Sequence, residues 1–175
     1  MNRSPIRTII AGAGLCLMPA LAAAQRVSVD YDRDADFSKY RSYTWRPGVP
    51  APSPFVDKRI VDAVDKQLAS RGWSRQDETP SAVVIYQAAV GAERELNAWG
   101  SGPRWNGFGR VSAETIYTGE LVVDIYDAAS RQLLWRGFAS DTVSDKPEKN
   151  EKRLNEAVAK LFKQFPPARN GSGTK

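Results

Sequence analysis

The fold is decided by the stretch Glu120-Leu-Val-Val-Asp-Ile-Tyr-Asp-Ala-Ala-Ser-Arg-Gln-Leu-Leu-Trp-Arg-Gly-Phe138. Its two ends, 120–126 and 132–138, are rich in leucine, β-branched and aromatic side chains, which favour strands. The polar segment 127–131 between them is typical of a short turn. The stretch therefore predicts a β-hairpin, in which Trp135 is a core or sheet-face residue and Arg136 its outward neighbour.

Three further segments predict strands. Residues 26–31 and 41–45 alternate polar and apolar side chains, as half-buried strands do. Residues 82–90 are apolar on both alternations, which favours a central strand covered on much of both faces. The proline-rich segment 47–54 predicts a stiff linker instead of regular structure.

Two segments predict amphipathic helices. The first begins at the N-cap candidate Ser53 and ends near Gly72. The side of this helix that carries Asp57 and Asp65 is expected to be solvated. The second helix follows Pro147 and ends before the proline pair 166–167. Their apolar stripes consist of Val56, Ile60, Val64 and Leu68 in the first, and Leu154, Val158, Leu161, Phe162 and Phe165 in the second.

The order of these elements is strand, strand, helix, three strands, helix. Runs of adjacent strands with only two helices indicate an α+β protein. We therefore expect a two-layer sandwich, with a mostly antiparallel sheet of about five strands and two amphipathic helices on one face.

The N-terminal segment of the chain predicts an exported protein. Residues 1–24 combine Arg3 and Arg7 with an apolar stretch and a small-residue run that ends at Ala24, the pattern of a cleavable signal peptide. An uncleaved membrane anchor is the alternative, but the apolar stretch is about half the roughly 20 residues that a spanning helix needs. We expect one α+β domain over 25–167 and a disordered tail over 168–175, which is rich in glycine, serine and lysine. The expected location is the periplasm, with outer-membrane association as an option.

The composition excludes several classes of function. The chain has no histidine, and its one cysteine, Cys16, lies in the predicted signal peptide. This excludes Ser-His-Asp and Cys-His triads and zinc sites of the usual ligand set, so no metal or cofactor is expected. After loss of Arg3 and Arg7, 23 basic side chains (25 − 2) face 20 acidic ones. This excess is too small to indicate nucleic acid as a partner.

Several segments resemble the bacterial domain-of-unknown-function family 4136. They are Val29-Asp-Tyr-Asp32, Ala35-Asp-Phe-Ser-Lys-Tyr40, Tyr43-Thr-Trp45, Leu121-Val-Val-Asp124 with Leu134-Trp-Arg-Gly137, and Pro147-Glu-Lys-Asn150 through Phe162-Lys-Gln-Phe-Pro-Pro167. The resemblance implies an exported envelope protein with an α+β two-layer fold and no established activity. Many members are lipoproteins, but Leu15 stands before Cys16, where a lipoprotein signal needs a small residue. We therefore expect this protein to be released rather than lipidated.

The most unusual stretch is 97–110, which is rich in glycine and predicts a long loop between strands. Its candidate partner- or ligand-binding residues are Trp99, Arg104, Trp105, Phe108 and Arg110. Aromatic faces with arginine nearby offer a large contact area and oriented donors for a sugar ring or another protein. Two alternatives remain: the aromatic residues cover the sheet, or the loop is disordered.

Two groups of carboxylates are candidate sites. The aspartates 30, 32, 34 and 36 alternate, but the glycine and glutamate that an EF-hand requires are missing. We expect them to be solvated charges around a strand end. Glu93 and Glu95 would share one face of a strand and are also expected to be solvated charges.

The sequence thus favours a non-catalytic binding or structural module whose partner is an unknown envelope protein or glycan. No nucleic acid and no transmembrane span after signal cleavage are expected. The alternative is a carboxylate-based hydrolase that acts on envelope glycans through Glu93 and Glu95.

Overall fold

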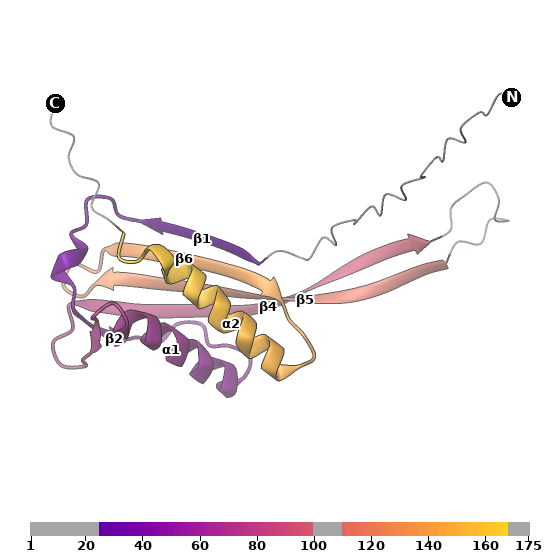
Figure 1. The fold of residues 1–175 in the computed structure, drawn as a ribbon, viewed down its shortest axis with the longest axis horizontal. Helices are drawn as coiled ribbons and strands as arrows, with labels where there is room; N and C mark the ends of the chain where they lie inside the picture. Colours follow the sequence, from indigo (N-terminus) through magenta and orange to yellow (C-terminus); the bar gives the residue numbers. More distant parts are fainter. Residues whose placement is uncertain (1–24, 100–109, 168–175) are drawn as a thin grey trace, which may run out of the picture.

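A computed structural model describes residues 25–99 and 110–167 of the chain (Figure 1). The predicted signal peptide, the predicted tail and residues Arg104, Trp105 and Phe108 lie outside this part. The strands are β1 (Arg26–Tyr31), β2 (Ser42–Trp45), β3 (Ser74–Arg75), β4 (Ala82–Trp99), β5 (Arg110–Asp127) and β6 (Leu133–Thr142). The helices are α1 (Pro54–Ala69) and α2 (Pro147–Leu161), with short 3-10 turns at Phe37–Lys39 and Phe162–Gln164.

The strands form one six-stranded sheet in the order β1-β6-β5-β4-β2-β3. The pairs β1–β6, β6–β5 and β5–β4 are antiparallel, whereas β2 pairs in parallel with both β4 and β3. Helix α1 connects β2 to the strands that follow, as a parallel pair requires. The predicted α+β sandwich is confirmed. The sixth strand is the two-residue β3, which is too short to leave a periodic pattern.

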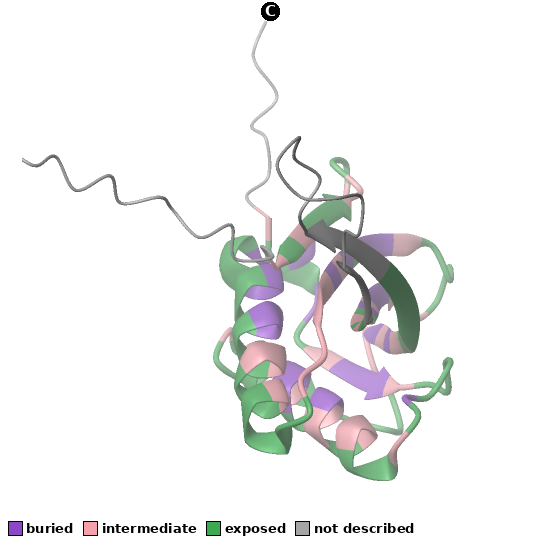
Figure 2. Ribbon diagram, turned by 90° about the vertical axis from the view of Figure 1, so that its right-hand side faces the viewer, coloured by how far each residue is buried: buried purple, intermediate pink, exposed green. Residues whose placement is uncertain are grey.

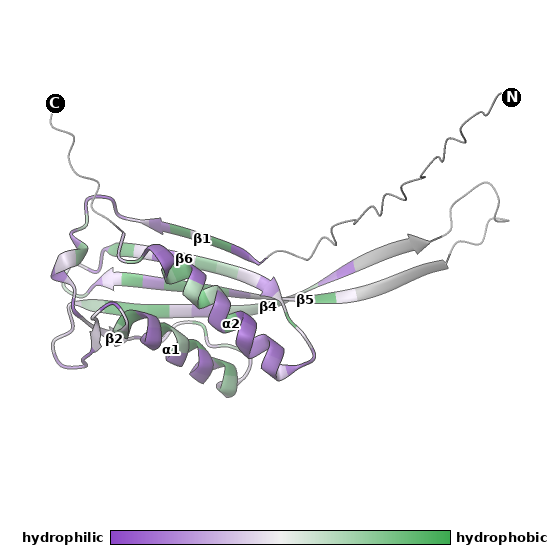
Figure 3. Ribbon diagram, viewed as in Figure 1, coloured by the Kyte–Doolittle hydropathy of each residue, from purple (hydrophilic) through white to green (hydrophobic). Residues whose placement is uncertain are grey.

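Both helices pack on the same face of the sheet and run side by side in the same direction (Figure 1). At their N-terminal halves Arg59 of α1 pairs with Glu151 of α2, at 3.2 Å between Nε and Oε2. At their C-terminal ends Arg71 Nε donates to the carbonyl of Phe165 at 2.7 Å. Figure 2 shows the buried residues of the helices on the side turned to the sheet, and Figure 3 shows polar and apolar residues alternating along both helices.

The core is filled unevenly along the sandwich. At the C-terminal ends of the helices six aromatic residues pack together, and Trp135 lies 4.9 Å from Phe162 and 5.4 Å from Phe165 between ring centroids. The backbone of β6 packs closely against this cluster, because a Cβ on Gly137 would lie 2.5 Å from the Trp135 ring. Toward the N-terminal ends of the helices the core positions carry small side chains, including Ala139 of β6 and Ala157 of α2.

Strands β4 and β5 continue beyond the rest of the sheet as a two-stranded arm (Figure 1). The arm consists of residues 92–99 and 110–117, whose backbones pair from Ala92↔Tyr117 to Trp99↔Arg110. In the described part of the chain, β6 pairs with β5 only from Thr118 onward. The prediction of a loop over 97–110 was therefore wrong at both ends, because β4 extends to Trp99 and β5 begins at Arg110. The described side chains 92–94 are all exposed, so they show no alternation of the kind that marks a half-buried strand.

Candidate functional site

An apolar hollow of about 230 Å³ lies between the N-terminal halves of the two helices and the sheet, at the root of the arm. We call it the arm-root hollow. Its floor is formed by Ala88, Leu121 and Ala139, and its walls by Val56 and Ile60 of α1 and Leu154 and Ala157 of α2.

The arm-root hollow exists because one row of the sheet carries small side chains. Ala88 of β4 lies opposite Leu121 of β5, which in turn lies opposite Ala139 of β6. Two rows further along the same face the three positions are Val84, Ile125 and Trp135, all fully buried. The helices are spaced to cover the large residues, so the row with two alanines leaves space above it. Protein interiors are otherwise close-packed.

Polar contacts fix the walls of the arm-root hollow. Arg59 and Glu151 pair across its rim. Arg153 donates to the carbonyl of Thr142 at the end of β6. Asn150 accepts from the amide of Ser144 and donates to its carbonyl, both at 2.7 Å. These contacts tie the start of α2 to the connection from β6, so the wall formed by α2 is held in place without filling the space.

Apolar side chains continue outward from the hollow. Val90, which lines it, is exposed, and so is Tyr117 on the arm. Phe55, next to the lining residue Val56, is the most exposed large apolar residue described, at 77%. Exposed apolar residues that adjoin a hollow are typical of surfaces that bind another molecule.

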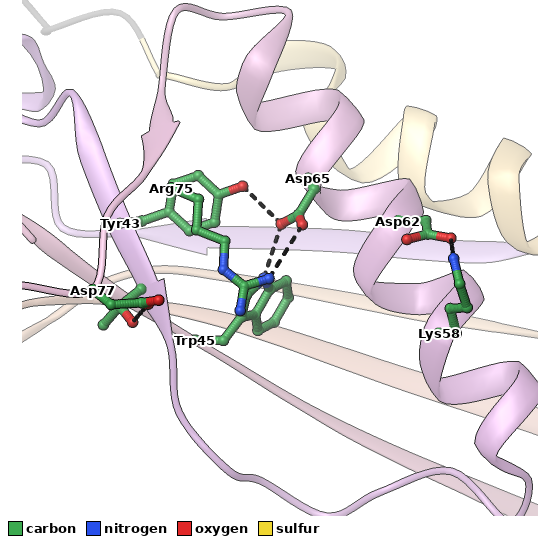
Figure 4. Close-up of polar contacts among 8 residues, drawn as sticks. Tyr43, Trp45, Lys58, Asp62, Asp65, Arg75 and Asp77 are labelled. Carbon is green, nitrogen blue, oxygen red and sulfur yellow. Dashed lines mark hydrogen bonds and ion pairs between the residues drawn. The ribbon is translucent and has the colours of Figure 1, made fainter.

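Asp65 of α1 anchors the helix to the sheet (Figure 4). Asp65 Oδ1 accepts from the Tyr43 hydroxyl at 2.7 Å and from the Trp45 indole nitrogen at 2.8 Å. One Arg75 nitrogen lies 3.8 Å from Asp65 Oδ2. The expectation that this side of α1 is merely solvated was therefore wrong for Asp65. Burial, followed by the hydrogen bond to Asp65, raises the pKa of Tyr43 above its ordinary value.

The second anchor is Asp57. The expectation that its side chain is merely solvated was also wrong, because it accepts two hydrogen bonds. Its Oδ1 accepts from the Tyr86 hydroxyl at 2.6 Å and from the amide of Ala51 at 2.7 Å. Burial and the bond to Asp57 raise the pKa of Tyr86 to about 12. Because Asp57 follows the lining residue Val56, this contact also positions the wall of the arm-root hollow.

The face of the sheet opposite the helices holds a carboxylate that sequence reasoning missed. Asp124, 1% exposed, accepts from Arg136 Nε at 2.6 Å and from Nη2 at 2.7 Å. The bidentate pair with Asp124 raises the pKa of Arg136. The only signal in the sequence was an aspartate inside an apolar strand. Trp135 is buried and Arg136 is exposed, as predicted.

The predicted site residues are placed only in part. Trp99 and Arg110 lie opposite each other at the end of the described arm. Glu93 is exposed on the arm, and Glu95 follows two positions later in β4 opposite Glu114. Arg104, Trp105 and Phe108 lie outside the described residues, so the structure does not bring the five candidates together.

The aspartate run has structural roles. Asp32 accepts from Gln132 Nε2 and from the amide of Asp34, both at 2.9 Å. Asp36 caps the first 3-10 turn through the amide of Ser38 at 3.2 Å. Within 25–99 and 110–167 there is no cluster of three carboxylate, cysteine or histidine side chains that could hold a metal ion. None of the helices in those ranges has the length and hydropathy that a membrane span requires.

Comparison with known families and structures agrees with this architecture. The family model "Domain of unknown function (DUF4136)" matches residues 27–167. A comparison with curated protein sequences gave no match.

Three solved structures are similar. A PDZ domain protein from Parabacteroides distasonis has a TM-score of 0.57 and 13% identity, over 84% of this chain and 37% of that one. The chain thus spans little more than a third of that protein. The PelC dodecamer from Paraburkholderia phytofirmans has a TM-score of 0.50 and 10% identity, over 79% of this chain and 96% of that one. Lipoprotein GNA1162 from Neisseria meningitidis has a TM-score of 0.43 and 11% identity, over 71% and 99%. The first two similarities show the fold alone.

Proposed function

The chain belongs to the DUF4136 family, and we propose that it is an exported, non-catalytic protein of the bacterial envelope that binds a partner through its arm and the arm-root hollow. The observation that carries the proposal is the position of this hollow. It is apolar, it is kept open by small side chains, and it lies where the arm leaves the body of the protein.

The sequence of residues 1–24 supports export. It has the charged start, the apolar stretch and the small-residue run of a cleavable signal peptide. The resemblance to the family points to the same compartment. Leu15 before Cys16 favours a protein released into the periplasm over a lipid-anchored one, and outer-membrane association would then depend on the bound partner.

The energetics of packing support a binding role. An unfilled apolar space lowers stability, by about 24 cal/mol per Å³ where it has been measured on engineered cavities. Filling the space would need only one larger side chain on the floor or wall. A two-stranded ribbon is also marginally stable in water without a third strand or a covering layer. Both features are stabilised when a partner covers them.

Three of the charged side chains that line the arm-root hollow support a non-catalytic role. Arg59 and Glu151 pair with each other, and Asp141 accepts from the side chain of Gln25 at 3.1 Å. Each of these groups therefore has a structural partner. The hydrolase alternative relies on Glu93 and Glu95, and Glu93 is exposed on the projecting arm; no observation on the described residues favours this alternative.

The experiment uses the immobilised protein to capture binding partners from purified sacculi and from detergent-solubilised envelope extract. Replacement of Trp99 and Trp105 by alanine is expected to lower capture at least tenfold, because Trp99 ends the described part of β4 and Trp105 belongs to the sequence 100–109 that joins β4 to β5. Circular dichroism of the double variant is expected to be unchanged. Undiminished capture by this variant would contradict a binding role for the arm.

A further inference from the structure

A second hollow lies on the face of the sheet that carries no helix, and it is independent of the arm-root hollow. It has a volume of about 510 Å³ and lies between the end of β2 and the turn that joins β5 to β6. We call it the arginine hollow. Arg46 and Arg131 lie at its rim, Val83, Ile85 and Tyr126 form its floor, and Asp127 and Ala128 complete its lining.

The sheet register brings these residues together from distant parts of the sequence. Val83 of β4 lies opposite Tyr126 of β5. Arg46 follows β2, and its amide donates to the carbonyl of Val84 at 3.0 Å, which fixes it beside Ile85. Arg131 ends the β5–β6 turn, where its amide donates to the carbonyl of Asp127 at 3.0 Å.

Arg131 has an unusual backbone conformation. Its φ is 61°, and it is the non-glycine residue with a positive φ in the described chain. Glycine adopts this region without strain, whereas a residue with a Cβ is disfavoured there. Strain of this kind is found where the side chain has a role. Arg131 places a guanidinium group beside the hollow. Glycine, the ordinary residue at a positive φ, could not supply this group.

The two arginines are not neutralised by nearby carboxylates. Asp124 is engaged by Arg136. Asp127 accepts from the Tyr40 hydroxyl at 2.8 Å and from the amides of Ala129 and Ser130 at 2.9 and 2.7 Å. Within 25–99 and 110–167, the guanidinium groups of Arg46 and Arg131 make no hydrogen bond or ion pair. The arginine hollow therefore holds two guanidinium groups to which no carboxylate of the described residues is paired, and the Asp127 carboxylate in its lining is held by three donors of its own.

We propose that the arginine hollow binds an acidic sugar, that is, a sugar ring that carries a carboxylate or a phosphate. Guanidinium groups bind both anions through paired hydrogen bonds. The C–H face of a sugar ring can lie on the Tyr126 ring and on the adjoining valine and isoleucine. A neutral sugar would leave the two charges without a partner, and a bare inorganic anion would leave the floor uncovered.

The test is an NMR titration of the ¹⁵N-labelled protein with four probes: glucuronic acid, glucose 6-phosphate, glucose and inorganic phosphate. The amides of Val83, Ile85 and Tyr126 are expected to shift saturably with one or both acidic sugars, and which acid binds identifies the anionic group. Glucose and inorganic phosphate are expected to bind at least tenfold more weakly. Equal affinity for either control, or the absence of any saturable shift with the acidic sugars, would overturn the proposal.

Two variants locate the site. Arg46→Gln and Arg131→Gly are each expected to weaken binding of the acidic sugar at least fivefold. Since glycine fits φ 61° without strain, Arg131→Gly is also expected to raise the melting temperature, so its loss of binding would not reflect unfolding. Arg26→Gln, at an exposed arginine opposite Ser140 at the far end of β6, is the matched control and is expected to bind normally. Undiminished binding by either hollow variant would contradict the assignment.

Discussion

Arg59 of α1 and Glu151 of α2 form an ion pair across the rim of the arm-root hollow, at 3.2 Å between Nε and Oε2. Both side chains are substantially exposed to solvent. Exposed ion pairs typically contribute about 0–1 kcal/mol to stability. The pair therefore does little to hold the helices together. The pair spans the rim of the hollow without filling the apolar space beneath it.

The ion pair between Asp124 and Arg136 predicts an asymmetric response to mutation. Arg136→Met leaves the buried Asp124 carboxylate without its partner and is expected to lower the free energy of unfolding by about 3 kcal/mol. Asp124→Asn leaves only a half-exposed arginine, 47% by side chain, and is expected to have a smaller effect. Urea denaturation measures both. Equal losses for the two variants would show that the burial of Asp124 does not determine the stability of the pair.

The hydrogen bond from Tyr86 to Asp57 predicts a pH-dependent stability. Tyr86→Phe is expected to lower the free energy of unfolding by about 1.5–3 kcal/mol at neutral pH, because it removes a hydrogen bond to a charged acceptor. The folded pKa of Tyr86 is raised to about 12, above about 10 in the unfolded chain. The contribution is therefore complete below pH 10 and is lost as the pH rises through 12.

Urea denaturation of both proteins at a series of pH values tests this prediction. The difference in stability between the unaltered protein and Tyr86→Phe should shrink from pH 10 to pH 12. Tyr117→Phe, at an exposed tyrosine, is the matched control and is expected to have no effect. A difference that does not change with pH would contradict the link between the phenol and Asp57.

The close packing around Gly137 predicts that even one methyl group is not tolerated there. An added Cβ would lie 2.5 Å from the Trp135 ring and 2.9 Å from Leu161 Cδ2, so Gly137→Ala is expected to lower stability by about 1–3 kcal/mol. At Gly91 an added Cβ meets nothing within 4 Å. Gly91→Ala is therefore the matched control and is expected to be neutral or slightly stabilising. Thermal denaturation distinguishes the two, and equal melting temperatures would contradict the packing described.

The fold was predictable where burial leaves a periodic pattern. The apolar stripe Val56, Ile60, Val64 and Leu68 marks α1, and the apolar runs around the turn 127–131 mark the β5–β6 hairpin. The arm was not predictable in this way because residues 91–94 are exposed on both alternations. Its β-branched and aromatic residues Thr115, Ile116 and Tyr117 were the available signal.

The candidate site was predictable to a smaller extent. The arm-root hollow depends on Ala88 and Ala139 lying in the same row of the sheet, and strand register between distant segments cannot be deduced from either segment alone. The same holds for Asp57 and Asp65, whose partners Tyr86 and Tyr43 lie on different strands. On the helix pattern alone, both aspartates fall on the polar side.

The arm-root hollow is tested most directly by filling it. Ala157→Leu places a larger apolar side chain in the space between α2 and the sheet, and the added burial is expected to leave stability unchanged or to raise it by about 1 kcal/mol. Ala159→Leu makes the same change at an exposed position of the same helix. Capture of partners from sacculi or envelope extract is measured for both variants, with thermal denaturation as the check on folding. The account predicts that Ala157→Leu lowers capture at least tenfold while Ala159→Leu captures normally; a folded Ala157→Leu that captures as well as the unaltered protein would contradict it.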